Sequence, residues 1–188
     1  MEKGLFEFLS NSYSTLIEEL INANSIYTNI DETIKWTFAW DENPAITGAV
    51  NRETNIMSIN VVFVDRAYKD NRIFDIEYFL LHEMRHIYQH IQIERYSVNK
   101  NTIDPVFILK WIEEGKNYIK ALDENGNENP NYFKQDCEFD AYAFSYAVMS
   151  HKYSRKFNSL LFVPSVYENE FKKEFKEVVN DFLNSFKK

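Results

Sequence analysis

Three residues in the stretch FLLHEMRHIYQH (79–90) have the types and the spacing of a metal site with a general base beside it. His82 and His86 are four residues apart, and Glu83 follows the first histidine directly. On a helix, positions four apart lie about 40° from each other and one turn along the axis, so both imidazoles project from one face. Two such histidines can bind one zinc ion, at about 2.0–2.1 Å from each nitrogen. Glu83 does not fully share that face, and we expect it to act as a general base on a water molecule at the metal.

The alternative interpretation is a polar helix face that matches the pattern by accident. A pattern this short arises by chance in about one chain in a hundred of this length. Most of its neighbours are apolar, namely Phe79, Leu80, Leu81, Met84, Ile87, Tyr88 and Ile91. Burying two histidines and a glutamate among them without partners is costly, and a bound metal would offset that cost. We therefore favour the metal site.

The motif HEMRH resembles the signature of the zincin metallopeptidases, which implies a zinc peptidase with a third protein ligand. The metzincin type requires a histidine six residues beyond His86, and Gln92 stands there, so that type is excluded. The later segment CEFDAYAFSYAVM is similar to the third-ligand segment of the ImmA/IrrE-like gluzincins, with Glu138 as the ligand. The residues that match the pattern after it are Ala141, Phe144, Ser145 and Met149.

Two other carboxylates compete with Glu138 for the role of third ligand. Asp136 and Asp140 flank it at two residues on each side, about 200° round a helix, so one of the three should face the histidines. We favour Glu138, because Gln135 and Tyr142 share its face. The two aspartates then lie on the charged side.

The resemblance also raises expectations about the surroundings of the metal. It implies that a strand MSINVVFVD (57–65) forms the upper edge of the cleft and pairs with substrate backbone by β-addition. Arg85 stands where most zincin signatures have an uncharged residue, and we expect it to flank the site, with Asp140 as a candidate partner. Tyr142 stands one turn after Glu138, where related families often have an acidic or amide side chain. The residues that support the ligands are therefore unassigned.

Several further side chains are candidates for polarising the substrate carbonyl or stabilising its oxyanion: His90, His151, Tyr118, Tyr132 and Tyr142. Each also has an ordinary structural role as an alternative. A histidine on a helix is often partly exposed, and a tyrosine is often a core residue with its hydroxyl in water.

Hydrophobic periodicity predicts an α+β fold in which a small antiparallel sheet packs against helices, in the manner of zincins. The helices are expected at 5–21, 73–96, 105–122 and 132–150, with a C-terminal helix at 165–187. A strand is expected at 33–40, and 45–65 is expected to form two strands around a turn near Asn51–Asn55. The motif helix 73–96 supplies the two histidines, and a later helix supplies the third ligand. We expect a single zincin-like domain over 1–188, in which residues 1–30 form an N-terminal helical extension.

Composition excludes several classes of protein. The net charge of -8 argues against a nucleic-acid partner. Cys137 is the only cysteine, so an intrachain disulfide is impossible, and we expect this residue to be buried core rather than a zinc ligand. We find neither a secretion signal nor a membrane span, so a soluble cytoplasmic protein is the expectation. The oligomeric state is not predicted.

The expected function is a zinc metallopeptidase that acts on an intracellular protein or peptide substrate. Zinc is bound by His82, His86 and Glu138, and Glu83 takes a proton from water and passes it to the leaving amine. The alternative is a catalytically silent regulatory or binding module that keeps a zincin fold and a structural zinc. A helical adaptor without metal is a third interpretation, but it leaves the motif unexplained.

Overall fold

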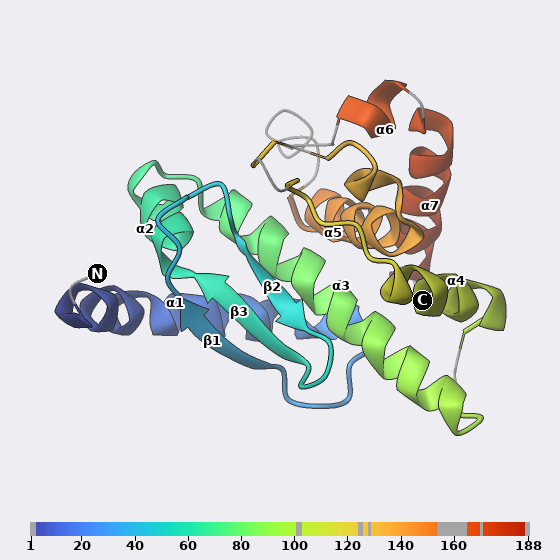
Figure 1. Ribbon diagram of the computed structural model, residues 1–188, viewed down its shortest axis with the longest axis horizontal. Coiled ribbons are helices and arrows are strands. Elements are labelled where there is room, and N and C mark those ends of the chain that lie inside the picture. The colour runs from blue at the N-terminus through green and yellow to red at the C-terminus, as the bar shows by residue number, and fades with distance from the viewer. Residues whose placement is uncertain are drawn as a thin grey trace. The chain divides into compact units, whose positions relative to one another are not determined.

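Figure 1 shows a computed structural model of the protein, and the residues that it describes are 3–100, 103–123, 126–127, 129–153, 165–169 and 171–186. The described chain is α+β, with mostly helices and one small three-stranded sheet. It divides into two compact units, Met1–Tyr88 and Gln89–Lys188, and the division falls inside helix α3 (Ile73–Ser97). The expectation of one zincin-like domain over 1–188 stays a prediction.

The first unit contains the sheet, in which β1 (Lys35–Ala39), β3 (Ile56–Asn60) and β2 (Gly48–Asn51) lie side by side in that order. β2 and β3 form the antiparallel hairpin that the sequence predicts. β1 instead runs parallel to β3, so the prediction of a wholly antiparallel sheet is wrong for this strand. The segment 57–65 is not an edge strand either, because β3 has a partner on both sides. A peptide that added a strand to this sheet would have to pair with β1 or β2.

The parallel pairing of β1 depends on the connection 40–47, which passes the end of β3 before the chain enters β2. One side chain holds this connection. The Oδ1 atom of Asn60 accepts a hydrogen bond from the backbone N–H of Asp41 at 3.1 Å, and its Nδ2 donates to the carbonyls of Asn43 and Ile46 at 3.2 and 2.7 Å. A short hairpin would have made the strands antiparallel. The alternation of apolar residues in the sequence does not predict this longer connection between β1 and β2.

Helix α2 (Val61–Lys69) replaces the second half of the predicted strand 57–65. Asn60 ends β3 and caps this helix, since its Oδ1 also accepts a hydrogen bond from the N–H of Val62 at 3.1 Å. Three residues at helical spacing are then 0% exposed: Val61, Val64 and Ala67. β-Branched residues favour strands, but a cap and burial at helical spacing outweigh that preference here.

Helix α1 (Lys3–Thr28) extends the predicted helix 5–21 at both ends, whereas Met1 and Glu2 of the expected extension lie outside the described residues. Its buried apolar residues recur every four positions: Leu9, Tyr13, Ile17 and Ile21. Two polar contacts fix it within the first unit. The Tyr13 hydroxyl donates to Oδ1 of Asp65 at 2.8 Å, and the Asn24 amide donates to Oε1 of Glu77 at 2.9 Å.

In the second unit, the last part of α3 is followed by helix α4 (Pro105–Lys116), whose start is as predicted, because the Asp104 side chain caps it and proline takes the first position. The helix ends at Lys116 rather than near 122. The predicted helix 132–150 begins as a 3-10 turn, η1 (Tyr132–Lys134), and continues as helix α5 (Asp136–Tyr153).

The predicted C-terminal helix 165–187 occurs as two helices, α6 (Ser165–Asn169) and α7 (Lys172–Ser185), and Lys187 lies outside the described residues. They pack on α5 through a cluster of buried residues: Ala143, Ala147, Tyr167, Phe175 and Val179. Among the described residues, no helix combines the length and the apolar character that crossing a membrane requires.

Candidate metal centre

Helix α3 positions both histidines of the motif. Every residue from Ile76 to Arg85 is buried, which is why this helix has apolar side chains on all faces. His82 and Glu83 are 5% and 6% exposed, whereas His86 is partly exposed. His86 is therefore the more solvent-accessible member of the histidine pair.

The two imidazoles direct the same nitrogen toward each other. Nε2 of His82 lies 3.0 Å from Nε2 of His86, and the ring planes are 87° apart. Two nitrogens bound to one tetrahedral zinc at about 2.0–2.1 Å are separated by about 3.3 Å. Without an ion, the same spacing lets the N–H of one imidazole donate to the other. The pair therefore fits a shared metal with little change of geometry.

Glu138 joins the two histidines in a three-residue group. It lies in the first turn of α5 and is 0% exposed. His82, His86 and Glu138 each offer one ligand atom, and these atoms all lie within 4.8 Å of one another. Two histidines and one glutamate are a known donor set of catalytic zinc, which keeps a fourth position for water or substrate. The structure thus brings together the three residues that the sequence singles out as metal ligands.

Two tyrosines surround the carboxylate of Glu138. The Tyr118 hydroxyl donates to Oε1 of Glu138 at 2.6 Å, and the ring of Tyr132 stands perpendicular to that of Tyr118 with 6.3 Å between centroids. Burial, followed by the charge of Glu138, raises the pKa of both tyrosines well above the usual value of a phenol. Both hydroxyls therefore stay protonated at neutral pH, and donation to the carboxylate favours its ionised, metal-binding form.

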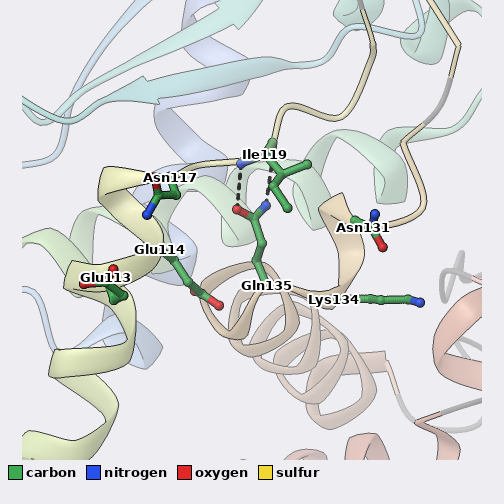
Figure 2. A pocket seen from close by; sticks show the side chains of 7 residues that line it. All are labelled: Glu113, Glu114, Asn117, Ile119, Asn131, Lys134 and Gln135. Atoms are coloured by element: carbon green, nitrogen blue, oxygen red, sulfur yellow. Dashed lines mark hydrogen bonds between the residues drawn. The ribbon is translucent and has the colours of Figure 1, made fainter.

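The first turn of α5 is held by residues that come before it in the chain. The backbone N–H groups of Asp136 and Cys137 donate to the Glu114 carboxylate, which thereby caps the helix. The Gln135 amide pairs with the backbone of Ile119 in both directions, as Figure 2 shows. These segments line an open hollow of about 390 Å³, formed by Glu113, Glu114, Asn117, Ile119, Asn131, Lys134 and Gln135.

Gln89 connects the last part of α3 to α5 within the second unit. Its Nε2 donates to the carbonyl of Cys137 at 2.9 Å and to Oδ2 of Asp140 at 2.8 Å. These two acceptors flank Glu138 in the sequence, and Gln89 itself comes one turn after His86. Gln89 thus holds the part of α3 that belongs to the second unit against the stretch of α5 that contains Glu138.

The rival third ligands have other roles. Asp136 pairs with Lys110 at 3.0 Å and keeps 46% of its side chain exposed. Asp140 accepts the hydrogen bond from Gln89. Cys137 is 5% exposed and packs with Ile108 and Trp111, as the sequence predicts. These contacts of Asp136, Cys137 and Asp140 agree with the assignment of Glu138 as the inward-facing carboxylate.

The remaining candidates do not belong to the metal-binding group found among the described residues. His151 is exposed, with its ring 5.5 Å from that of Phe186, and Tyr142 packs against Phe133 and Tyr167. His90 is partly exposed. The Arg85 guanidinium lies over the ring of Tyr88, 4.3 Å from its centroid, and its pairing with Asp140 stays a prediction.

Sequence reasoning did not find Gln89, Glu114 or Gln135. For Gln89 a signal existed, because it lies three residues after His86 and so on a neighbouring face of the same helix. The other two act across loops of irregular structure, where spacing predicts no direction. The sequence does not rank the three tyrosines that are candidates for stabilising the oxyanion. Only the fold shows that Tyr118 contacts Glu138, whereas Tyr142 packs against Phe133 and Tyr167.

Neither a protein-family model nor any curated protein or solved structure matches this chain at a significant level.

Proposed function

We propose that this protein is a zinc-dependent metallopeptidase that hydrolyses a peptide bond in a protein substrate. The observation that carries the proposal is the His82–His86–Glu138 group, in which one ligand atom from each residue lies within 4.8 Å of the others. A Zn²⁺ ion held there would act as a Lewis acid that polarises the scissile carbonyl and makes water more acidic.

Glu83 has the role of general base in this proposal. It follows His82 on α3, about 100° round the helix from it, and is 6% exposed, so it lies in a largely water-excluded environment. It takes a proton from the attacking water and delivers it to the nitrogen of the leaving amine. A base of this kind contributes about 10²–10⁴-fold to rate.

A hydroxyl donor at the third ligand also favours this function. Glu138 is fully buried, and the ionised carboxylate is stabilised there by the hydroxyl of Tyr118. If the His82–His86 motif had arisen by accident, it would not require a buried, hydrogen-bonded glutamate 52 residues after His86 (138 − 86).

The test combines metal analysis with a search for cleavage. We expect the purified chain to contain about one zinc per molecule, as three protein ligands imply, and to cut members of a peptide library in a manner that a chelator abolishes. Glu83→Gln is the matched control, since it should keep zinc and lose cleavage. A wild-type chain that holds no zinc contradicts the proposal. Zinc without cleavage of any peptide supports instead a regulatory module with a structural zinc.

A further inference from the structure

Tyr118 lies two residues beyond the end of α4, in a stretch of the second unit without helix or strand, yet its side chain reaches a ligand of the proposed metal site. The hydroxyl donates to Oε1 of Glu138 at 2.6 Å, a length typical of a hydroxyl bonded to an ionised carboxylate. The residue is 39% exposed, so it is not a core residue whose ring fills the interior. The ordinary role of a tyrosine as packing does not account for this placement.

The backbone next to Tyr118 is fixed to the same turn of the chain that leads into Glu138. The N–H of Ile119 donates to Oε1 of Gln135 at 2.9 Å, and Nε2 of Gln135 donates back to the carbonyl of Ile119 at 3.0 Å (Figure 2). Gln135 is 5% exposed, so water does not compete freely for this pair. The anchor lies three residues before Glu138.

A third contact completes the connection between this segment and α5. The Glu114 carboxylate, at the end of α4, accepts hydrogen bonds from the N–H groups of Asp136 and Cys137. The segment before Tyr118 and the residue after it are thus both held to the start of α5. The hydroxyl is therefore presented to Glu138 by a rigid frame rather than by a mobile loop.

We propose that Tyr118 is a positioning residue that holds Glu138 in its metal-binding orientation and thereby sets the zinc affinity of the site. This inference rests on the proposed function and adds to it. A carboxylate has two oxygens, and a donor fixed on one of them favours binding of the ion through the other. Partners that orient a metal ligand in this way typically contribute about 10–100-fold to metal affinity.

The experiment measures zinc dissociation constants of the full chain by competition with a chromophoric chelator. Tyr118→Phe removes one hydroxyl and keeps the ring, and we expect it to bind zinc about 10–100-fold more weakly than wild type. Tyr13→Phe is a matched control, because Tyr13 also donates its hydroxyl to a carboxylate, Oδ1 of Asp65 at 2.8 Å. Asp65 is not in the metal-binding group, so this variant should keep the wild-type affinity.

A second readout separates positioning from general loss of structure. Cobalt can replace zinc at such sites, and its visible absorption reports the arrangement of the ligands. At saturating cobalt, Tyr118→Phe should have a changed spectrum and Tyr13→Phe an unchanged one, while both variants melt at similar temperatures without metal. An unchanged spectrum together with a zinc affinity within about twofold of wild type overturns the role of Tyr118.

The outcomes distinguish this inference from the proposed function. If wild type binds zinc, Glu138→Ala loses it and Tyr118→Phe does not weaken it, the site stands and only the positioning role fails. If wild type binds no zinc, or Glu138→Ala binds as tightly as wild type, both are overturned.

Discussion

At the scale of single residues, the proposed mechanism gives separate tasks to nearby positions on α3. The Nε2 atom of His86, which lies 3.0 Å from that of His82, would bind the metal, and Glu83 would take the proton. Replacing Glu83 by Gln keeps the size and polarity of the side chain but removes its basicity. We expect Glu83→Gln to retain zinc and to lose about 10²–10⁴-fold in cleavage rate. His86→Ala should lose both, and metal content beside a cleavage assay distinguishes the two variants. Wild-type cleavage by Glu83→Gln would contradict the mechanism.

Tyr13 supports a prediction about alkaline pH. Burial, and next the hydrogen bond to Asp65, raises the pKa of Tyr13 from 10.0 to about 12. The folded state therefore holds this proton more tightly than the unfolded state does. The resulting stability is fully present below pH 10 and is lost as the pH rises through about 12.

We therefore expect the urea midpoint of the metal-free chain to fall between pH 10 and 12, and to fall less steeply in Tyr13→Phe. The pKa of Tyr118, Tyr132 and Tyr146 is also raised, so some slope should remain in this variant. Equal slopes in both proteins would contradict the assignment to Tyr13.

At the scale of elements, Asn60 decides where β3 ends and α2 begins. One amide group accepts from the connection 40–47 and from the first turn of α2, and it donates to two carbonyls. Asn60→Ala should destabilise the chain by about 2–4 kcal/mol, since a cap contributes about 1 kcal/mol and each buried group left unpaired costs about 1–3. Asn60→Asp keeps the acceptor, but its second carboxylate oxygen would face the carbonyls of Asn43 and Ile46 in a buried site, so its loss should be at least as large. Urea denaturation of both variants tests this order, and a smaller loss in Asn60→Asp would contradict it.

The same region shows how far sequence patterns predict structure. The motif helix, the start of α4 at Asp104–Pro105 and the hairpin follow from local rules of periodicity, capping and turns. The parallel pairing of β1 depends on hydrogen bonds of Asn60 to a connection far from it in sequence, and the helical state of 61–65 depends on its cap on Val62 and on burial at helical spacing. β-Branched residues alone predict a strand there, and tertiary contacts decide otherwise.

The residues of the candidate site also differ in how far the sequence predicts their roles. Glu138 could be preferred over Asp136 and Asp140 because helix geometry gives each residue a face, and burial agrees with that choice. Gln89 lies one turn after His86, but its partners, like that of Tyr118, could not be assigned, since they lie 48 and 20 residues away and follow from packing of whole elements.

At the scale of the whole molecule, zinc should act as a link between folding and binding. The three proposed ligands lie on α3 and α5, which are joined by a long stretch of chain, so the unfolded chain does not preform the site. A ligand that binds only the native state adds RT ln(1 + [L]/Kd) to stability, which is about 2.7 kcal/mol at a hundredfold excess over Kd. We therefore expect zinc at that excess to raise the thermal midpoint of wild type by about 5–11 °C, because 1 kcal/mol shifts the midpoint of a chain of this size by about 2–4 °C. His86→Ala should show a much smaller rise at the same zinc concentration, and a chelator should return wild type to its metal-free midpoint. Equal shifts in wild type and His86→Ala would mean that zinc stabilises the protein elsewhere than at these three residues.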